Sequence, residues 1–84
     1  MLNDYLTLNK LDTGSSCKIV SIKTEGIFRR RLLDLGFIPN TLVKALFRSP
    51  ASDPTAYELR GSVIALRSDE ASQIIVEKCL KGDY

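Results

Sequence analysis

The sequence predicts a mostly β fold: a small antiparallel β-barrel of about five short strands with one main α-helix. The chain has 84 residues, of which 44% are hydrophobic, so residues 1–84 are expected to fold as one domain around one core. Short segments of alternating polar and apolar side chains recur between turn signals, whereas only one segment has the periodicity of a helix. A closed barrel is expected because it leaves few strand edges unpaired.

The first predicted strand covers residues 16–22, where β-branched and polar side chains follow an Asp-Thr-Gly-Ser turn at 12–15. Thr24 is then predicted to cap a helix from about residue 25 to 35, because its hydroxyl can accept a hydrogen bond from the first helical turn. The predicted core-facing stripe of this helix consists of Phe28, Leu32 and Leu35.

A glycine marks the end of this helix. Gly36 is predicted to take the left-handed conformation that follows many helices, and Phe37 to pack back on Leu32 as in a Schellman motif. Pro39 cannot continue the helix. Residues 38–41 are therefore predicted to form a turn, with the asparagine at its third position at positive φ.

Three further strands and a loop are predicted in the second half of the chain. Residues 42–48 alternate as a half-buried strand does, and a loop follows at 49–54. The strand at 55–60 is predicted to join a strand at 63–67 through a type II′ turn at Gly61-Ser62. The predicted buried face of the 42–48 strand consists of Val43, Ala45 and Phe47.

A short helical turn is expected near residues 69–73. Ser68 is predicted to cap it, and Asp69 and Glu70 are well placed for its dipole. Residues 74–77 are predicted to complete the sheet as its last strand.

The composition argues against catalysis and against nucleic-acid binding. Twelve Lys and Arg against ten Asp and Glu give a net charge of +2, which is a weak electrostatic footprint for a nucleic-acid binder. The chain has no histidine, so the commonest general base is missing, and no glycine-rich loop is present to hold phosphates. We therefore expect no enzyme, no catalytic residue and no cofactor.

Potential metal ligands are scattered along the sequence. Cys17 and Cys79 are predicted to be small, buried apolar side chains, with a disulfide or a metal pair as the alternative. The carboxylates are expected to be solvated, with a site for a hard cation as the alternative. The acids considered for such a site are Asp53, Glu58, Asp69 and Glu70. No metal site is assigned.

No segment predicts a membrane span or an export signal. The longest apolar runs, at 63–66 and 74–76, fall far short of the roughly 20 residues that a span needs. The N-terminus has no basic and apolar leader and no myristoylation glycine. We expect a cytoplasmic protein without direct membrane insertion.

Three consecutive arginines lie in the predicted helix. Arg29 and Arg30 point away from the core stripe, whereas Arg31 lies at its margin. Glu25 is expected to pair with Arg29, and Asp34 with Arg30. The arginines are interpreted as a solvated face, with partner binding and nucleic-acid binding as alternatives.

Leu33 is an apolar residue on the outer side of the predicted helix, next to Arg29. One interpretation is that a terminus or the 49–54 loop covers it. The other is that Leu33 and its arginine border form a docking patch, since interfaces combine an apolar centre with a polar rim.

An ordered series of motifs covers most of the chain. It consists of Arg-Arg-Arg-Leu-Leu-Asp-Leu-Gly-Phe-x-Pro-x-Thr at 29–41, Arg-Ser-Pro at 48–50, Asp-Pro at 53–54, Glu-x-Arg-Gly at 58–61, Ile-Ala-Leu-Arg at 64–67 and Ile-Val at 75–76. In this series, over roughly residues 6–77, the chain resembles the FeoA family. It departs from the family at Ser52, where members usually have a glycine.

The resemblance implies an SH3-like barrel and a non-enzymatic accessory or regulatory protein of bacterial ferrous-iron uptake. It also implies a partner, the cytoplasmic GTPase part of the FeoB permease, through which the protein would reach the inner membrane. Two alternatives remain: a small-barrel nucleic-acid-binding module, and a metal-sensing domain related to the C-terminal domains of iron-dependent repressors. Transition-metal binding would rest on analogy alone.

The resemblance and the helical wheel together give a set of expected site residues, while the oligomeric state stays open. The expected partner-binding residues are Arg29, Arg30, Leu33, Ser49, Pro50, Asp53 and Pro54. The expected structural residues are Phe28, Leu32, Leu35, Gly36, Phe37, Pro39 and Gly61.

Overall fold

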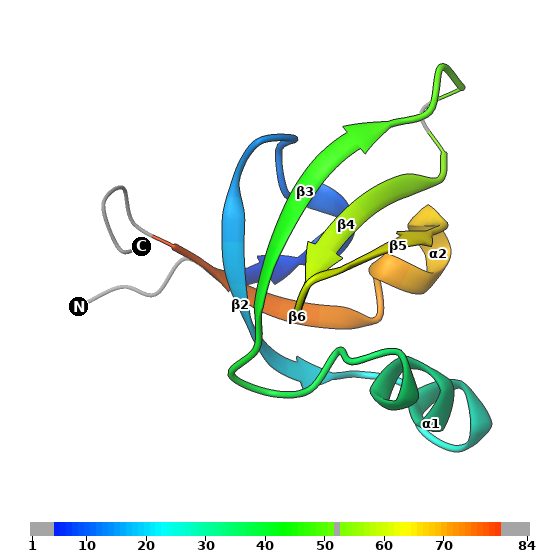
Figure 1. The fold of residues 1–84 in the computed structure, drawn as a ribbon. Coiled ribbons are helices and arrows are strands. Elements are labelled where there is room, and N and C mark those ends of the chain that lie inside the picture. Colours follow the sequence, from blue (N-terminus) through cyan, green and yellow to red (C-terminus); the bar gives the residue numbers. More distant parts are fainter. Residues whose placement is uncertain (1–4, 52, 80–84) are drawn as a thin grey trace.

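The computed structural model describes residues 5–51 and 53–79, which form one curled antiparallel sheet with two α-helices and a 3-10 turn (Figure 1). The strands follow the order β1-β6-β2-β3-β4-β5 in the sheet. Their bounds are β1 Tyr5–Thr7, β2 Ser16–Ile22, β3 Leu42–Arg48, β4 Thr55–Leu59, β5 Ser62–Leu66 and β6 Ile74–Lys78. The other elements are the 3-10 turn η1 (Leu8–Lys10), helix α1 (Ile27–Asp34) and helix α2 (Ser68–Ala71).

The predicted fold class is confirmed, with one strand more than expected. The expected closure by strand pairing is not present among the described residues, because the end strands β1 and β5 do not pair. β1 was missed because it has only three residues, too few to show alternation. It is held by β6, where Leu6 lies opposite Val76. Among the described residues, no helix is both long enough and apolar enough to cross a membrane.

The core lies inside the curl of the sheet. Its largest fully buried side chains include Tyr57 from β4 and Phe37 from the segment after α1. The η1 segment covers this core with Leu8 and Leu11, both fully buried. Each buried leucine contributes about 1.5 to 3 kcal/mol of hydrophobic stabilisation, so η1 is a structural part of the domain.

Helix α1 begins two residues later than predicted. Gly26, with φ of 75°, is the N-cap, and the predicted cap at Thr24 is wrong. A residue at positive φ lies outside the right-handed helical region, so the helix cannot extend back through Gly26.

The end of α1 has the predicted Schellman geometry. Gly36 has φ of 110° and donates its N–H to the carbonyl of Leu33 at 3.0 Å. Phe37, fully buried, donates its N–H to the carbonyl of Leu32 at 3.1 Å. These two bonds satisfy carbonyls that a helix end leaves without partners.

The turn after α1 is also as predicted. Asn40 has φ of 75°, and the Thr41 N–H donates to the carbonyl of Ile38 at 3.0 Å. Pro39 occupies the second position, where its fixed φ suits such a turn. The turn brings the chain to the start of β3, and Thr41, just before that strand, accepts a hydrogen bond at its carbonyl from the Ile19 N–H.

One prediction on β3 is wrong. Val43 and Ala45 are fully buried as expected, but the side chain of Phe47 is 60% exposed. The pairing of β3 with β4 shifts between Ala45 and Phe47. A bulge of this kind breaks the alternation of faces, so Phe47 leaves the core face.

The β4–β5 hairpin and the start of α2 each differ by one residue from the prediction. Leu59 pairs with Ser62, so the central turn residues are Arg60 at φ of 52° and Gly61 at φ of 80°. Two positive φ angles identify a type I′ turn rather than type II′. In α2 the N-cap is Arg67 instead of Ser68.

Candidate functional site

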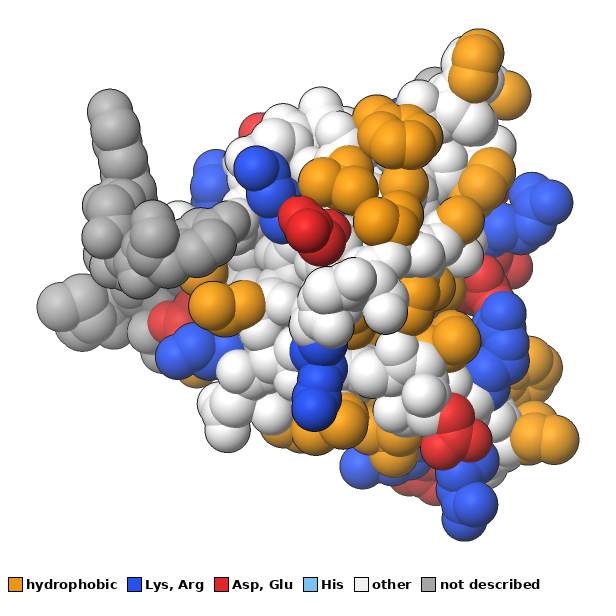
Figure 2. All heavy atoms as spheres, in the orientation of Figure 1, with side chains coloured by type: hydrophobic (Ala, Val, Ile, Leu, Met, Phe, Trp, Pro, Cys, Tyr) orange, Lys and Arg blue, Asp and Glu red, His pale blue; other side chains and the backbone are white. Residues whose placement is uncertain are grey.

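The first turn of α1 exposes two large apolar side chains. Ile27 is 79% exposed and Phe28 67% exposed. Figure 2 shows hydrophobic side chains next to cationic ones at the corner of the molecule that α1 forms. We call Ile27, Phe28, Arg29 and Arg30 the α1 tip.

The prediction that Phe28 faces the core is therefore wrong. The helix contacts the core through its second half, where Leu32 is buried and Leu35 is half-buried against the core cluster. Its first turn projects beyond the sheet (Figure 1). The helical periodicity put Phe28 on the same face as Leu32 and Leu35, but it could not show how far along the helix that face contacts the core.

Leu33 does not form the exposed centre of a docking patch. It is half-buried and packs against the core cluster. Leu33 is thus covered by the core cluster, and not by the 49–54 loop as one interpretation had it. Ile27 is the exposed apolar residue that the sequence analysis missed, and Gly26 was the available signal, since glycine is a common N-cap.

The arginines of α1 have different partners from those predicted. Arg29 and Arg30 are exposed as expected, and Arg29 donates from Nη1 to the carbonyl of Ile22 at 3.3 Å. The ion pairs formed by residues 5–51 and 53–79 are Arg31–Glu70 and Arg67–Asp53, so neither expected pair of Arg29 or Arg30 is present. The cationic charge of the α1 tip is therefore not neutralised by a contact within the described chain.

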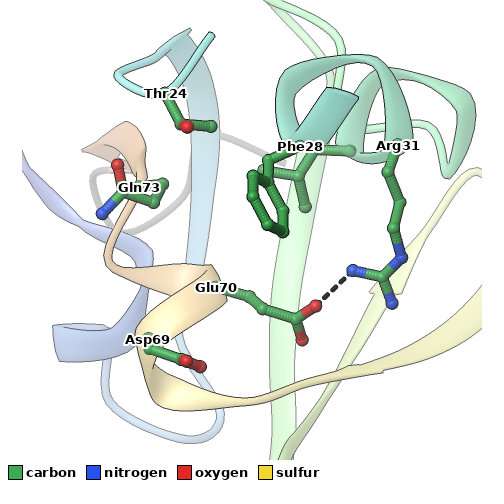
Figure 3. Close-up of a pocket in the computed structure, with 7 residues that line it drawn as sticks. Thr24, Phe28, Arg31, Asp69, Glu70 and Gln73 are labelled. Atoms are coloured by element: carbon green, nitrogen blue, oxygen red, sulfur yellow. Dashed lines mark hydrogen bonds and ion pairs between the residues drawn. The ribbon is translucent and has the colours of Figure 1, made fainter. Parts of the chain in front are cut away.

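Arg31 and Glu70 link α1 to α2 by an ion pair and hydrogen bond (Figure 3). Glu70 also accepts a hydrogen bond from the backbone N–H of Arg67 at 3.0 Å. This backbone hydrogen bond, together with Arg31, holds the pKa of Glu70 below its usual value. Glu70 thus caps α2 and fixes it to α1 at the same time.

A groove of about 370 Å³ lies between α1 and α2. In Figure 3 the Phe28 ring stands on the α1 side, with Asp69, Glu70 and Gln73 on the other side. The lining residues are Thr24, Phe28, Arg31, Leu32, Asp69, Glu70 and Gln73. An aromatic wall opposite polar groups can hold a partner's side chain, so the groove extends the surface of the α1 tip.

The 49–54 loop does not join this surface. Figure 1 shows the loop between β3 and β4 at the opposite end of the sheet from α1. The Ser49 hydroxyl donates to the Asp53 carbonyl at 2.7 Å, and Asp53 Oδ1 accepts from the Ser68 N–H at 2.7 Å. The first bond lies within the loop, and the second holds the loop against the start of α2. Ser52, the departure from the family pattern, lies outside the described residues.

Pro50 and Pro54 flank these anchoring contacts. Pro50 is exposed, Pro54 is half-buried, and the peptide bond before Pro54 is cis. Their role in partner binding stays a prediction.

The described residues contain no group of three or more His, Cys, Asp or Glu side chains that could hold a metal ion. The carboxylates Asp53 and Glu70 have structural partners instead. Cys17 is buried and Cys79 half-buried, and the two form no disulfide with each other. Burial, together with the neighbouring Cys79, raises the pKa of the Cys17 thiol to about 12, so Cys17 behaves as an inert core residue.

Comparisons with known proteins agree with this fold. A model of the FeoA domain family matches residues 6–78. A Porphyromonas gingivalis protein, named Fe(2+) transport protein A/Fe(2+) transporter FeoB fusion protein, is 32% identical over 72 residues. The match covers 86% of this chain and 8% of that protein, so this chain spans only a small part of the fusion protein.

Solved structures show the same architecture. The FeoA-like protein of Clostridium acetobutylicum has a TM-score of 0.86 at 32% identity, covering 100% of this chain and 96% of that one. The FeoA of Stenotrophomonas maltophilia, solved with zinc and described as an SH3 domain protein, has a TM-score of 0.76 at 27% identity, covering 84% and 88%. The expected SH3-like fold is thereby confirmed.

A more distant likeness concerns the fold alone. A manganese-dependent transcriptional repressor has a TM-score of 0.81 at 15% identity, covering 94% of this chain and 44% of that one.

Proposed function

The chain belongs to the FeoA domain family, whose members are accessory proteins of ferrous-iron transport, and from this premise we propose that it binds the cytoplasmic GTPase part of a FeoB-type permease. It acts by binding, as a non-enzymatic regulator. In this proposal it works in the cytoplasm and reaches the inner membrane only through its partner.

Support for this partner comes from the fusion protein of Porphyromonas gingivalis, which joins a transport protein A part to a transporter part in one chain. Two parts that are covalently joined in a relative are held at a high effective concentration. If the two parts are separate chains, they need an interface through which they bind each other.

The observation that carries the proposal is the exposure of Ile27 and Phe28 beside two arginines that lack acidic partners among the described residues. Burying one such side chain in a partner's pocket is worth about 1.5 to 3 kcal/mol. Arg29 and Arg30 form a cationic border that selects an acidic partner surface. We therefore assign the α1 tip as the contact face.

Phe28→Asp tests this assignment. It should weaken binding to the purified cytoplasmic part of the permease by about tenfold or more, since it removes an apolar anchor of more than 1.4 kcal/mol. Binding is measured by calorimetric titration, with and without guanine nucleotide.

Phe47→Asp is the matched control, because Phe47 is a similarly exposed phenylalanine on β3. It should bind as the unchanged protein does, and both variants should keep the circular dichroism of the parent. Equal affinity of Phe28→Asp and the parent protein would remove the α1 tip from the interface.

A second candidate function has one observation in its favour. The expectation of no nucleic-acid binding rested on the weak net charge, whereas the exposure of Phe28 and Phe47 supplies aromatic rings on which bases can stack. An exposed ring beside Arg29 and Arg30 could stack on a base of a single strand. Titration with oligonucleotides at two salt concentrations separates the candidates, since phosphate binding weakens steeply with salt.

Metal binding is not carried over from the Stenotrophomonas maltophilia protein. That protein was solved with zinc, whereas the described residues of this chain contain no group of three or more His, Cys, Asp or Glu side chains that could hold a metal ion.

A further inference from the structure

Strand β5 is the last strand of the sheet, so one of its long edges has no neighbouring strand among residues 5–51 and 53–79 (Figure 1). The pair Leu59 and Ser62 closes a two-residue turn, and opposite residues in an antiparallel hairpin alternate between hydrogen-bonded and non-hydrogen-bonded pairs. The backbone groups of Val63 and Ala65 therefore point away from β4. No hydrogen bond from another described residue reaches them outside the β4–β5 ladder.

This edge lacks the features that usually prevent strand addition. The sequence of β5, Ser-Val-Ile-Ala-Leu, contains no lysine, glutamate or proline. Val63 is 61% exposed, and Ala65 is exposed as well. Natural sheets normally protect such an edge with charges, proline, a bulge or a covering segment.

We propose that β5 is a docking edge for an extended segment of a protein partner, which adds to the sheet beside β5. Val63 and Ala65 each offer one N–H and one carbonyl at hydrogen-bonding spacing, and only an extended backbone presents complementary groups at that spacing. Affinity would come from these backbone bonds, and selectivity from the side chains of the added strand.

The charges around β5 favour a partner segment over a second copy of this chain. Arg60 precedes β5 and Arg67 follows it, and both are exposed. In a symmetric antiparallel pair of two β5 strands, Arg60 of one copy would approach Arg67 of the other, and like charges there are destabilising. Asp53 offsets Arg67 only from 4.0 Å, in an exposed pair of little strength.

The same charges define the segment that fits. Acidic residues at its two ends would meet Arg60 and Arg67. Its centre should be uncharged, because Glu58 lies opposite Val63 on the neighbouring strand. The chemistry is thus an extended stretch of β-branched residues with a carboxylate at each end.

The test uses a synthetic probe, the blocked peptide Asp-Val-Thr-Val-Thr-Val-Asp, titrated into the isotope-labelled protein. The expected result is saturable amide shifts at Val63 and Ala65, with hydrogen exchange of these two amides slowed about tenfold or more. Shifts confined to other residues, or none up to the solubility of the probe, would overturn the proposal.

Variants of β5 sharpen the result. Val63→Pro removes an N–H that faces the open edge and leaves the bonds to β4 in place, so it should abolish binding. Val63→Thr keeps the N–H and the β-branched shape, and should bind as the parent does. If Val63→Pro fails to fold, a probe with all central amide nitrogens methylated replaces it and should not bind.

Two further measurements address the charges and the occupant. A probe with lysine in place of both aspartates should bind at least about tenfold more weakly at low salt, and equal binding would overturn the stated chemistry. The protein should sediment as a monomer, and a dimer that Val63→Pro dissociates would identify a second copy as the occupant instead. Phe28→Asp should leave probe binding unchanged, so this test is independent of the α1 tip.

Discussion

Gly36 is the residue on which the placement of α1 depends most directly. At φ of 110° a residue with a Cβ is strained, and the added Cβ would lie 3.3 Å from Cδ1 of Leu59. This position could be predicted from the sequence because a glycine followed by two apolar residues and a proline is a local signal for the end of a helix.

Gly36→Ala should lower the free energy of unfolding by about 1 to 3 kcal/mol, and Gly36→Val by more, since a β-branched residue resists positive φ further. Thermal unfolding measures this change. Gly14→Ala is the matched control, because Gly14 also has positive φ, 87°, but no atom lies within 4 Å of its added Cβ. If Gly36→Ala is no more destabilising than Gly14→Ala, the proximity of Leu59 does not exclude a Cβ at position 36.

Helix α1 could be predicted from the sequence only in part. Its existence and its C-terminal cap follow from local chemistry, and both were predicted. Its exposed first turn was not, because the buried extent of a helix depends on which neighbouring elements it meets. The partner of Arg31 could not be predicted either, since Glu70 is 39 residues away in the sequence.

The contact between α1 and α2 should depend on pH through Glu70. The pKa of Glu70 is lower in the folded protein than in the unfolded chain. Such a carboxylate stabilises the fold at pH values above its pKa in the unfolded chain, and this stabilisation is lost as the pH falls through its pKa in the folded protein. The free energy of unfolding should therefore decrease as the pH falls below about 4.5, the ordinary value for this group. Chemical denaturation at several pH values measures this decrease.

In Glu70→Gln the free energy of unfolding should decrease less at low pH than in the parent protein, and it should be lower than that of the parent at neutral pH. Glu58→Gln is the control, because Glu58 is exposed and forms no ion pair within the described part of the chain. A pH profile of Glu70→Gln identical to that of the parent would contradict the assigned role of Glu70.

For the whole molecule, the bounds of most strands could be predicted from the sequence, whereas the exposed apolar side chains of its surface could not. Strands β2, β3 and β6 were predicted nearly to the residue, because alternation and turn residues are local signals. The exposure of Phe47 was not, since it depends on a bulge in the pairing with β4. On the proposed contact face, Arg29 and Arg30 are exposed as expected. Leu33 is half-buried against the core, and the exposed apolar residues are Ile27 and Phe28 instead.

The most direct test of the central claim is a footprint of the permease's cytoplasmic part on this protein. The isotope-labelled protein is titrated with the unlabelled permease fragment, and changes in amide signals are mapped on the structure. We expect the largest changes at residues 27–30 and along the groove that α1 forms with α2. Changes confined to the 49–54 loop, or no binding at all, would contradict the assignment of the α1 tip as the contact face.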